Sequence, residues 1–278
     1  MVQIVADSAC DFTREIIERE GCAVSYVPIN IQLEDRFFAD DGSLDVEMFL
    51  RQTEASTAAV KTAAPSPERF VDQYKKGDSV FVVTLSSGIS ATYQAAMTAK
   101  QMYLDEFGKK FIHVFDTLSA SAGEGLVAQK IAQAVAKGLS NLEIVTLVES
   151  FIASMRTYFM LDRFDSLVKS GRINPYVAKL ASLLNIKPIC GGVGGKLSML
   201  DKARGYSKAV AKLIETIKRD VPDPENRVVG ISHAKCFEKA VALKNELIKN
   251  LRVKDVIITE VGGVIASYAN RGGYVVAL

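Results

Sequence analysis

The chain has 278 residues, more than one domain usually holds, so we expect two domains that share an interface. Its 34 Lys and Arg residues against 32 Asp and Glu residues leave a formal net charge of +2, which argues against nucleic acid as a partner. The opening MVQIVADSACD reaches an acid at Asp7, and no apolar run approaches the roughly 20 residues that cross a bilayer, so we expect a cytoplasmic protein.

Residues 1–155 alternate short β-branched runs with helical stretches. We expect strands at VQIVADS, VSYVPINIQL, SVFVVTLS and FIHVFDT, and helices over residues 90–107, 121–137 and 141–155. Such alternation predicts a parallel sheet with helices on both faces. The first domain is therefore predicted to be a three-layer α/β domain.

Residues 156–278 follow a different pattern, with short strands at RTYFMLDR, IKPICG, KLSMLDK, RVVGISHA and DVIITEVGG. Helices are expected over residues 206–219 and 237–250, on one face of a mixed sheet. Pro222 and Pro224 predict a surface loop between these elements, because two prolines so close together break a helix. The second domain is predicted to have two layers.

Two local patterns argue against common chemistry. The run GGVGGKL resembles a phosphate-binding loop, but Cys190 and Leu197 occupy positions that need Gly and Ser or Thr, so it predicts a glycine-rich hairpin turn. The four cysteines form no CxxC pair, which indicates reduced, packed thiols and neither a zinc site nor a disulfide framework. We therefore expect no metal.

Hydroxyls and acids gather where the predicted parallel strands end. Asp7 and Ser8 follow the first strand, residues 84–87 follow the third, and Asp116 and Thr117 follow the fourth. Ligands of open parallel sheets bind at this edge. The same residue types also cap helices, which is a sufficient explanation for any one of them alone.

Two loops before predicted helices offer a place for an anion. In TAAPSPERF the SPE triplet predicts a helix start and leaves Thr62 on the preceding loop. In LSSGISATYQ, Gly88 lies between Ser87 and Ser90 where a long helix begins. Hydroxyls and free amides in such places suit a carboxylate better than a phosphate, which calls for more positive charge.

Groups for acid–base or nucleophilic catalysis are scarce. His113 lies inside a predicted strand, where a packed imidazole is expected, and His233 closes another strand as a weak candidate for the rim of a site. No Cys–His pair, HExxH or GxSxG pattern occurs. Arg172, in a turn after a short amphipathic helix, is either a solvated surface group or an anchor for an anion or a partner protein.

Several motifs in a fixed order resemble the DegV family almost from end to end. They are VADSACDFT, KTAAPSP, LSSGISATYQAA, FDTLSASAGEGL, LVKSGRI, LLNIKPI with the later KARG, and the glycine-rich terminal strand. The resemblance implies a parallel α/β domain (1–155) joined to a two-layer mixed-sheet domain (156–278). It also implies a long-chain fatty acid buried between them, no cofactor, and a separate kinase that phosphorylates the carboxylate with ATP.

Site residues follow from the same resemblance. Thr62 and Ser90 match the family's carboxylate contacts; Tyr268 is expected to contact the carboxylate too, and Ser87, Ala63 and Arg271 are further candidates. Arg172, Lys202 and Arg204 match the face that meets the kinase. We also expect a monomer, and transient contact with a membrane is compatible with this function.

The chain departs from the family pattern at the head of the site. Ala63 stands where serine is usual, and Tyr268–Gly272 replaces the usual His-x-Gly-Pro-Gly. Tyrosine can donate a hydrogen bond but cannot carry a proton at neutral pH, so fatty-acid binding tolerates the change better than kinase chemistry does. Arg271, absent from the usual motif, offers a compensating positive charge.

Two other functions compete with the carrier. An enzyme related to the substrate domain of dihydroxyacetone kinases would need a suitably placed histidine, and neither His113 nor His233 has a fitting context. A ligand-free interaction module would have no elongated apolar cavity between its domains.

Overall fold

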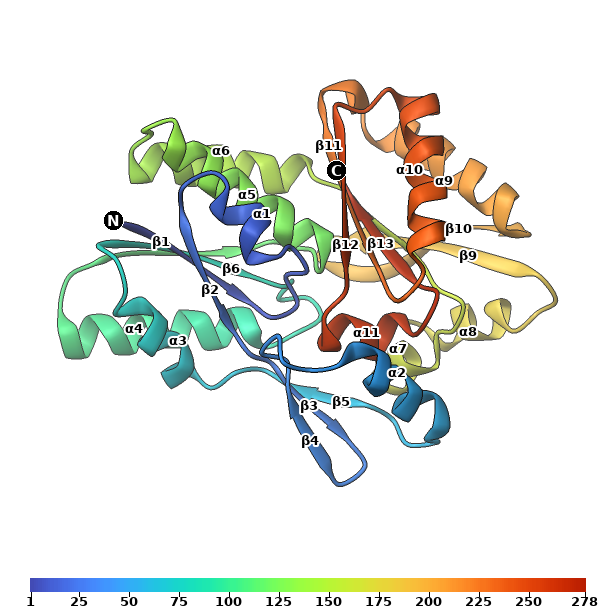
Figure 1. Ribbon diagram of the computed structural model, residues 1–278, viewed down its shortest axis with the longest axis horizontal. Helices are drawn as coiled ribbons and strands as arrows, with labels where there is room; N and C mark the ends of the chain where they lie inside the picture. Colours follow the sequence, from blue (N-terminus) through green and yellow to red (C-terminus); the bar gives the residue numbers. More distant parts are fainter.

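The computed structural model describes all 278 residues, which form three sheets and the helices around them (Figure 1). The first sheet is fully parallel, in the order β2-β1-β6-β7. Its strands are β1 (Val2–Asp7), β2 (Ala23–Val27), β6 (Ser79–Thr84) and β7 (Phe111–Asp116).

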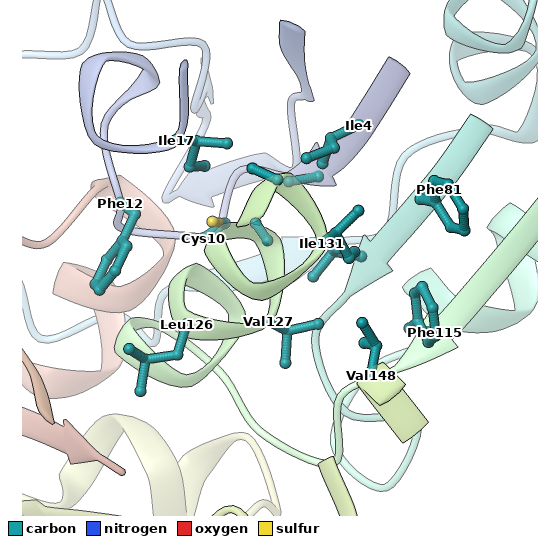
Figure 2. Close-up of a cluster of buried hydrophobic side chains, with 14 of the residues drawn as sticks. Ile4, Cys10, Phe12, Ile17, Phe81, Phe115, Leu126, Val127, Ile131 and Val148 are labelled. Carbon is teal, nitrogen blue, oxygen red and sulfur yellow. The ribbon is translucent and has the colours of Figure 1, made fainter. Parts of the chain in front are cut away.

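Helices cover both faces of this sheet, which confirms the three-layer prediction. They are α1 (Arg14–Glu18), α3 (Pro67–Tyr74), α4 (Thr92–Phe107), α5 (Ala122–Ala136) and α6 (Asn141–Ser154). Alternate residues of β1 point to opposite faces. Ile4 packs with α1, α5 and α6 (Figure 2), whereas Val5 packs with α3 and α4.

A small antiparallel sheet, absent from the sequence-based expectations, follows β2. Its strands are β3 (Asn30–Leu33), β4 (Arg36–Ala39) and β5 (Lys61–Ala63), in the order β4-β3-β5. The run VSYVPINIQL is therefore not one strand, because it divides at Pro28 between two sheets. Thr62, expected on a loop, pairs with Ile31 as part of β5.

The second domain contains a six-stranded mixed sheet in the order β10-β9-β8-β13-β11-β12, and only β11 and β12 run parallel. The strands are β8 (Thr157–Met160), β9 (Ile186–Val193), β10 (Lys196–Arg204), β11 (Val228–His233), β12 (Asp255–Glu260) and β13 (Tyr274–Ala277). Gly194 and Gly195, both with positive φ, form the β9–β10 turn, as the glycine-rich run predicts.

Helices α9 (Tyr206–Asp220) and α10 (Phe237–Leu251) cover one face of the mixed sheet. The other short helical elements are α2 (Val46–Ala55), α7 (Asp165–Lys169), α8 (Pro175–Ala181), α11 (Gly263–Ala269) and the 3-10 turn η1 (Pro224–Asn226). The predicted loop around Pro222 thus contains one turn of 3-10 helix.

Helix α5 joins the two halves of the molecule. It packs on β1 and β6 of the parallel sheet and also on β11 and β13 of the mixed sheet (Figure 1). All strands of the parallel sheet lie before residue 117 and all strands of the mixed sheet lie after residue 156. The domain boundary at residues 155 and 156 remains a prediction.

Candidate functional site: an apolar cavity between the sheets

A cavity of about 370 Å³ lies where the parallel sheet, the small antiparallel sheet and the mixed sheet meet, and 17 of its 25 lining residues are hydrophobic. Ligand pockets of this kind start at roughly 300 Å³. The apolar wall comes from many elements and includes Ile29, Leu85, Ile89, Phe159, Leu161, Leu167, Leu197, Val264, Ile265 and Val275.

The β9–β10 turn closes part of the cavity. The hydroxyl of Ser86 donates a hydrogen bond to the carbonyl of Gly195 at 2.6 Å. A Cβ atom at Gly88 would lie 2.5 Å from that same carbonyl oxygen, so only glycine allows this approach. The glycine-rich β9–β10 turn and Gly88 were both expected from the sequence, but their contact was not, because the glycines alone do not indicate which segments meet.

Two hydroxyls meet on the cavity wall. Thr62 on β5 and Tyr268 on α11 lie 2.7 Å apart, oxygen to oxygen, although 206 positions separate them in the sequence. The guanidinium of Arg172 lies 5.8 Å from the centre of the Tyr268 ring, at the distance of a cation–π contact. Uncharged donors and one positive charge therefore share this part of the wall.

Arg172 connects this group to Ser90. Its Nε donates to the carbonyl of Ile89 at 3.3 Å, and its Nη1 donates to the carbonyl of Ser170 at 2.8 Å. Ser90 lines the cavity just before α4, and its hydroxyl oxygen accepts the N–H of Thr92 at 3.2 Å. The structure thus brings Thr62, Ser90 and Tyr268 onto one cavity wall; their contact with a carboxylate remains a prediction.

The other candidate residues take different positions. Ala63 lines the cavity. The N–H and the hydroxyl of Ser87 both donate to Asp116, and Ser87 does not line the cavity. Lys202 and Arg204 are exposed on β10, an edge strand of the mixed sheet.

Arg271 also lies away from the cavity and holds α2. Its Nη1 and Nη2 donate to the two carboxylate oxygens of Glu47 at 2.8 and 3.0 Å, and its Nε donates to Glu54 at 3.0 Å. Hydrogen bonds from Arg271 lower the pKa of Glu47 to about 2. The positive charge of Arg271 is therefore paired with carboxylates of α2, and the cation on the cavity wall is Arg172.

Buried carboxylates position the helix that carries Tyr268. Asp40 accepts the N–H groups of Gly263 and Val264 at 2.8 and 2.9 Å, and Asp11 accepts the N–H of Gly262 at 2.7 Å. Burial raises the pKa of both acids. These bonds satisfy amides at the first turn of α11 that have no partner inside the helix.

Neither histidine lines the cavity. His113 is half-buried on β7, with its Nε2 3.5 Å from a carboxylate oxygen of Glu149. The Nδ1 of His233 accepts the N–H of Cys236 at 3.4 Å. Burial lowers the pKa of both imidazoles.

Metal sites and membrane-spanning helices have no counterpart among the residues. No three or more His, Cys, Asp or Glu side chains are grouped so as to hold a metal ion. No helix is both long enough and apolar enough to span a bilayer. The four cysteines are free thiols, three of them buried.

Comparisons with known proteins agree with this architecture. The family model described as "Uncharacterised protein, DegV family" matches residues 1–277. A DegV domain-containing protein of Streptococcus gordonii is 32% identical over 274 residues, which is 98% of this chain and 96% of that protein.

Solved structures give the same result. A DegV family protein of Ruminococcus gnavus, refined with vaccenic acid, has a TM-score of 0.93 at 36% identity. The match covers 100% of this chain and 99% of that chain. The Streptococcus pneumoniae Fatty Acid Kinase (Fak) B3 protein, loaded with linoleic acid, has a TM-score of 0.92 at 28% identity, with 100% of this chain and 98% of that chain covered. The sequence, the fold and these relatives agree that the chain belongs to the DegV family.

Proposed function

We propose that this protein is a non-enzymatic carrier that binds one long-chain fatty acid in the cavity between its two domains. The observation that carries the proposal is a mainly apolar cavity whose wall also holds the Thr62–Tyr268 hydroxyl pair, Ser90 and Arg172. Apolar walls suit a hydrocarbon tail, and hydroxyls with one cation suit a carboxylate. Relatives of similar fold that contain vaccenic or linoleic acid support the same function.

Affinity would come chiefly from the tail. An acyl chain of about 15 methylenes gains on the order of 12 kcal/mol at roughly 0.8 kcal/mol per buried CH₂, before the cost of ordering the chain. The polar groups have a different task, because a buried carboxylate without partners would cancel much of that gain. Thr62, Ser90 and Tyr268 would supply those partners, and no cofactor is required.

The bound acid would be presented to a separate kinase that phosphorylates its carboxylate. The relationship to the Fak B3 protein supports this step. Arg172 lies at the cavity wall, and Lys202 and Arg204 are exposed on an edge strand, so all three are candidates for contact with the kinase or its product. Tyr268 would contribute a hydrogen-bond donor to the carboxylate, which a phenol hydroxyl can supply.

Loading of the carrier would involve brief contact between α8 and a membrane. Val177 and Leu180 of α8 are buried, and Val177 packs in the same hydrophobic cluster as Leu167 of the cavity wall. Beyond the helix, Leu183 and Leu184 are 53% and 85% exposed, and Lys179 lies in its last turn. Exposed leucines beside a lysine suit the surface of an anionic bilayer.

The direct test is mass spectrometry of an organic extract of the denatured protein after purification from a bacterial host. We expect a long-chain fatty acid in a ratio near one per chain; an extract without stoichiometric lipid would refute the carrier function. Replacing Thr62 and Ser90 together by alanine should weaken binding at least tenfold, since each hydrogen bond to a charge contributes about 1.5–3 kcal/mol. Unchanged affinity would remove these residues from the carboxylate site without removing the carrier function.

A further inference from the structure

Four carboxyl groups are buried together at the junction of the two domains. Asp7, Asp11, Asp40 and Glu124 have exposed fractions of 0%, 6%, 5% and 0%. No lysine or arginine is buried anywhere in the chain. Buried charges without a cation are costly unless hydrogen bonds compensate them, so each of these acids needs a partner or a proton.

Backbone amides provide partners for three of the four acids. Asp11 and Asp40 receive N–H groups from the start of α11, and the hydroxyl of Ser121 also donates to Asp11. Asp7 accepts the N–H groups of Ala9 and Leu85, both at 2.8 Å. These three side chains can therefore accept hydrogen bonds as carboxylates.

Glu124 has no such donor. Both of its carboxylate oxygens are buried without a hydrogen-bond partner. The N–H of Ser121, three residues earlier, already donates to the carbonyl of Ala9 at 3.0 Å. The side chain close enough to share a hydrogen bond with Glu124 is Asp7, which is also an acceptor, so the contact requires a proton on one of the two.

We propose that Glu124 is protonated at neutral pH and donates a hydrogen bond to Asp7, so that the two side chains form one pair with a single negative charge. The assignment to Glu124 follows from the donors, because Asp7 already accepts two N–H groups and Glu124 accepts none. The pair lies at the domain junction, and its protonation does not depend on the identity of the ligand.

The location of the pair gives it a structural consequence. Glu124 lies in the first turn of α5, the helix that packs on both large sheets. Asp7 ends β1 and holds the N–H of Leu85, a residue of the cavity wall. Loss of the shared proton would place two anions in contact and push α5 away from β1. The junction and the adjacent cavity wall would then loosen.

Other titratable groups around α5 place no buried positive charge beside the pair. Burial is the main cause that raises the pKa of Asp7 to about 6 and that of Glu124 well above its ordinary value, and Asp11 adds to the shift of Glu124. Cys10, also buried, faces the same group. β6 carries no titratable residue, and the remaining ones on the packed elements α1, α6, β11 and β13 are Arg14, Glu15, Glu18, Glu143, Glu149, His233 and Tyr274.

The raised pKa fixes the direction of the pH effect. A carboxyl group whose pKa is higher in the folded chain than in the unfolded chain stabilises the fold below the unfolded value, near 4.5 for Glu124. That contribution is lost as the pH rises through the folded value. The contribution of the pair to the stability of the junction should therefore be greatest below about pH 4.5 and should fall as the pH rises from there through neutral to alkaline values.

Infrared spectroscopy of the full-length protein tests the protonation state directly. At pH 7 we expect a C=O stretching band from a protonated carboxylic acid, and this band should disappear reversibly as the pH rises. The band should be absent from Glu124→Gln. It should persist in Glu106→Gln, the control, because Glu106 is exposed on α4. Absence of this band from the wild-type protein at pH 7 would overturn the proposal, whether or not Glu124→Gln folds.

Thermal unfolding provides the second measurement. The Tm of the wild-type protein should fall between pH 7 and 9. The neutral amide of Glu124→Gln would imitate the protonated acid, so the Tm of this variant should fall much less over the same range. The Tm of Glu106→Gln should fall as much as that of the wild-type protein. Equal pH dependence in all three proteins would contradict the proposal. A fall in wild-type Tm after dialysis against a chelator would also contradict it, because a bound cation would then satisfy the carboxyl groups.

Discussion

At the scale of single residues, Phe12 fills the space between the two domains. It is 1% exposed in the loop after β1 and lies beside α5 (Figure 2). A Cβ atom at Gly125 of α5 would lie 2.2 Å from its ring, and one at Gly230 of β11 would lie 3.2 Å away. The ring thus requires glycine at position 125 and packs closely against Gly230 on the other side of the junction.

We predict that Gly125→Ala destabilises the protein by about 1–3 kcal/mol, since overpacking forces neighbouring side chains to shift. The loss should occur even though alanine favours helix more than glycine does. Gly192→Ala is the matched control, because its added Cβ would meet no atom closer than 3.6 Å. Chemical denaturation measures both variants, and equal stability of Gly125→Ala and the wild-type protein would show that Phe12 can move aside.

At the scale of elements, the sequence predicted the long helices, the strands of the two large sheets and the short helices α3 and α7, and it missed the small antiparallel sheet and short helices such as α2 and α11. The parallel sheet, α4, α5 and α6 follow from their periodic patterns. The small sheet does not, because β5 has only three residues and is separated from its partner β3 by the 27 residues 34–60. Pro28 was the one local sign that the expected long strand would divide.

The types of residue in the site could be predicted from the sequence, but their arrangement in space could not. Thr62, Ser90 and Arg172 could be picked out from their loops and turns, and Tyr268 from the family pattern. Their convergence could not be derived, since it depends on β5, α11 and the turn after α7 meeting in space. The partners of Ser87 and Arg271, which are Asp116 and Glu47, likewise come from tertiary structure alone.

The exposed leucines in the turn after α8 are the residues expected to contact a membrane. Replacing Leu183 and Leu184 together by serine should reduce binding to vesicles that contain phosphatidylglycerol about tenfold, because much of the apolar area available to the bilayer is removed. Leu142→Ser is the control, as Leu142 is 73% exposed on α6. Cosedimentation measures the bound fraction; an equal loss in the control would assign the contact elsewhere.

At the scale of the whole molecule, the cavity and the domain junction are built from the same parts. Three elements connect the half of the molecule that contains the parallel sheet to the half that contains the mixed sheet. They are helix α5, the start of α11 and the β9–β10 turn. Residues adjacent to these contacts also line the cavity, among them Leu85, Ser86 and Val264. A ligand that fills the cavity therefore touches both domains and should stabilise the fold as a unit.

We accordingly predict that delipidated protein unfolds at a lower temperature than loaded protein. A ligand at one hundred times its Kd stabilises a fold by about 2.7 kcal/mol, which corresponds to roughly 5–10 °C in Tm for a chain of this size. Added oleate should restore the higher Tm, whereas octanoate at the same concentration should not, because it buries far fewer methylenes. Calorimetry measures both, and an equal response to the two acids would mean that the carboxylate, not the tail, supplies the affinity.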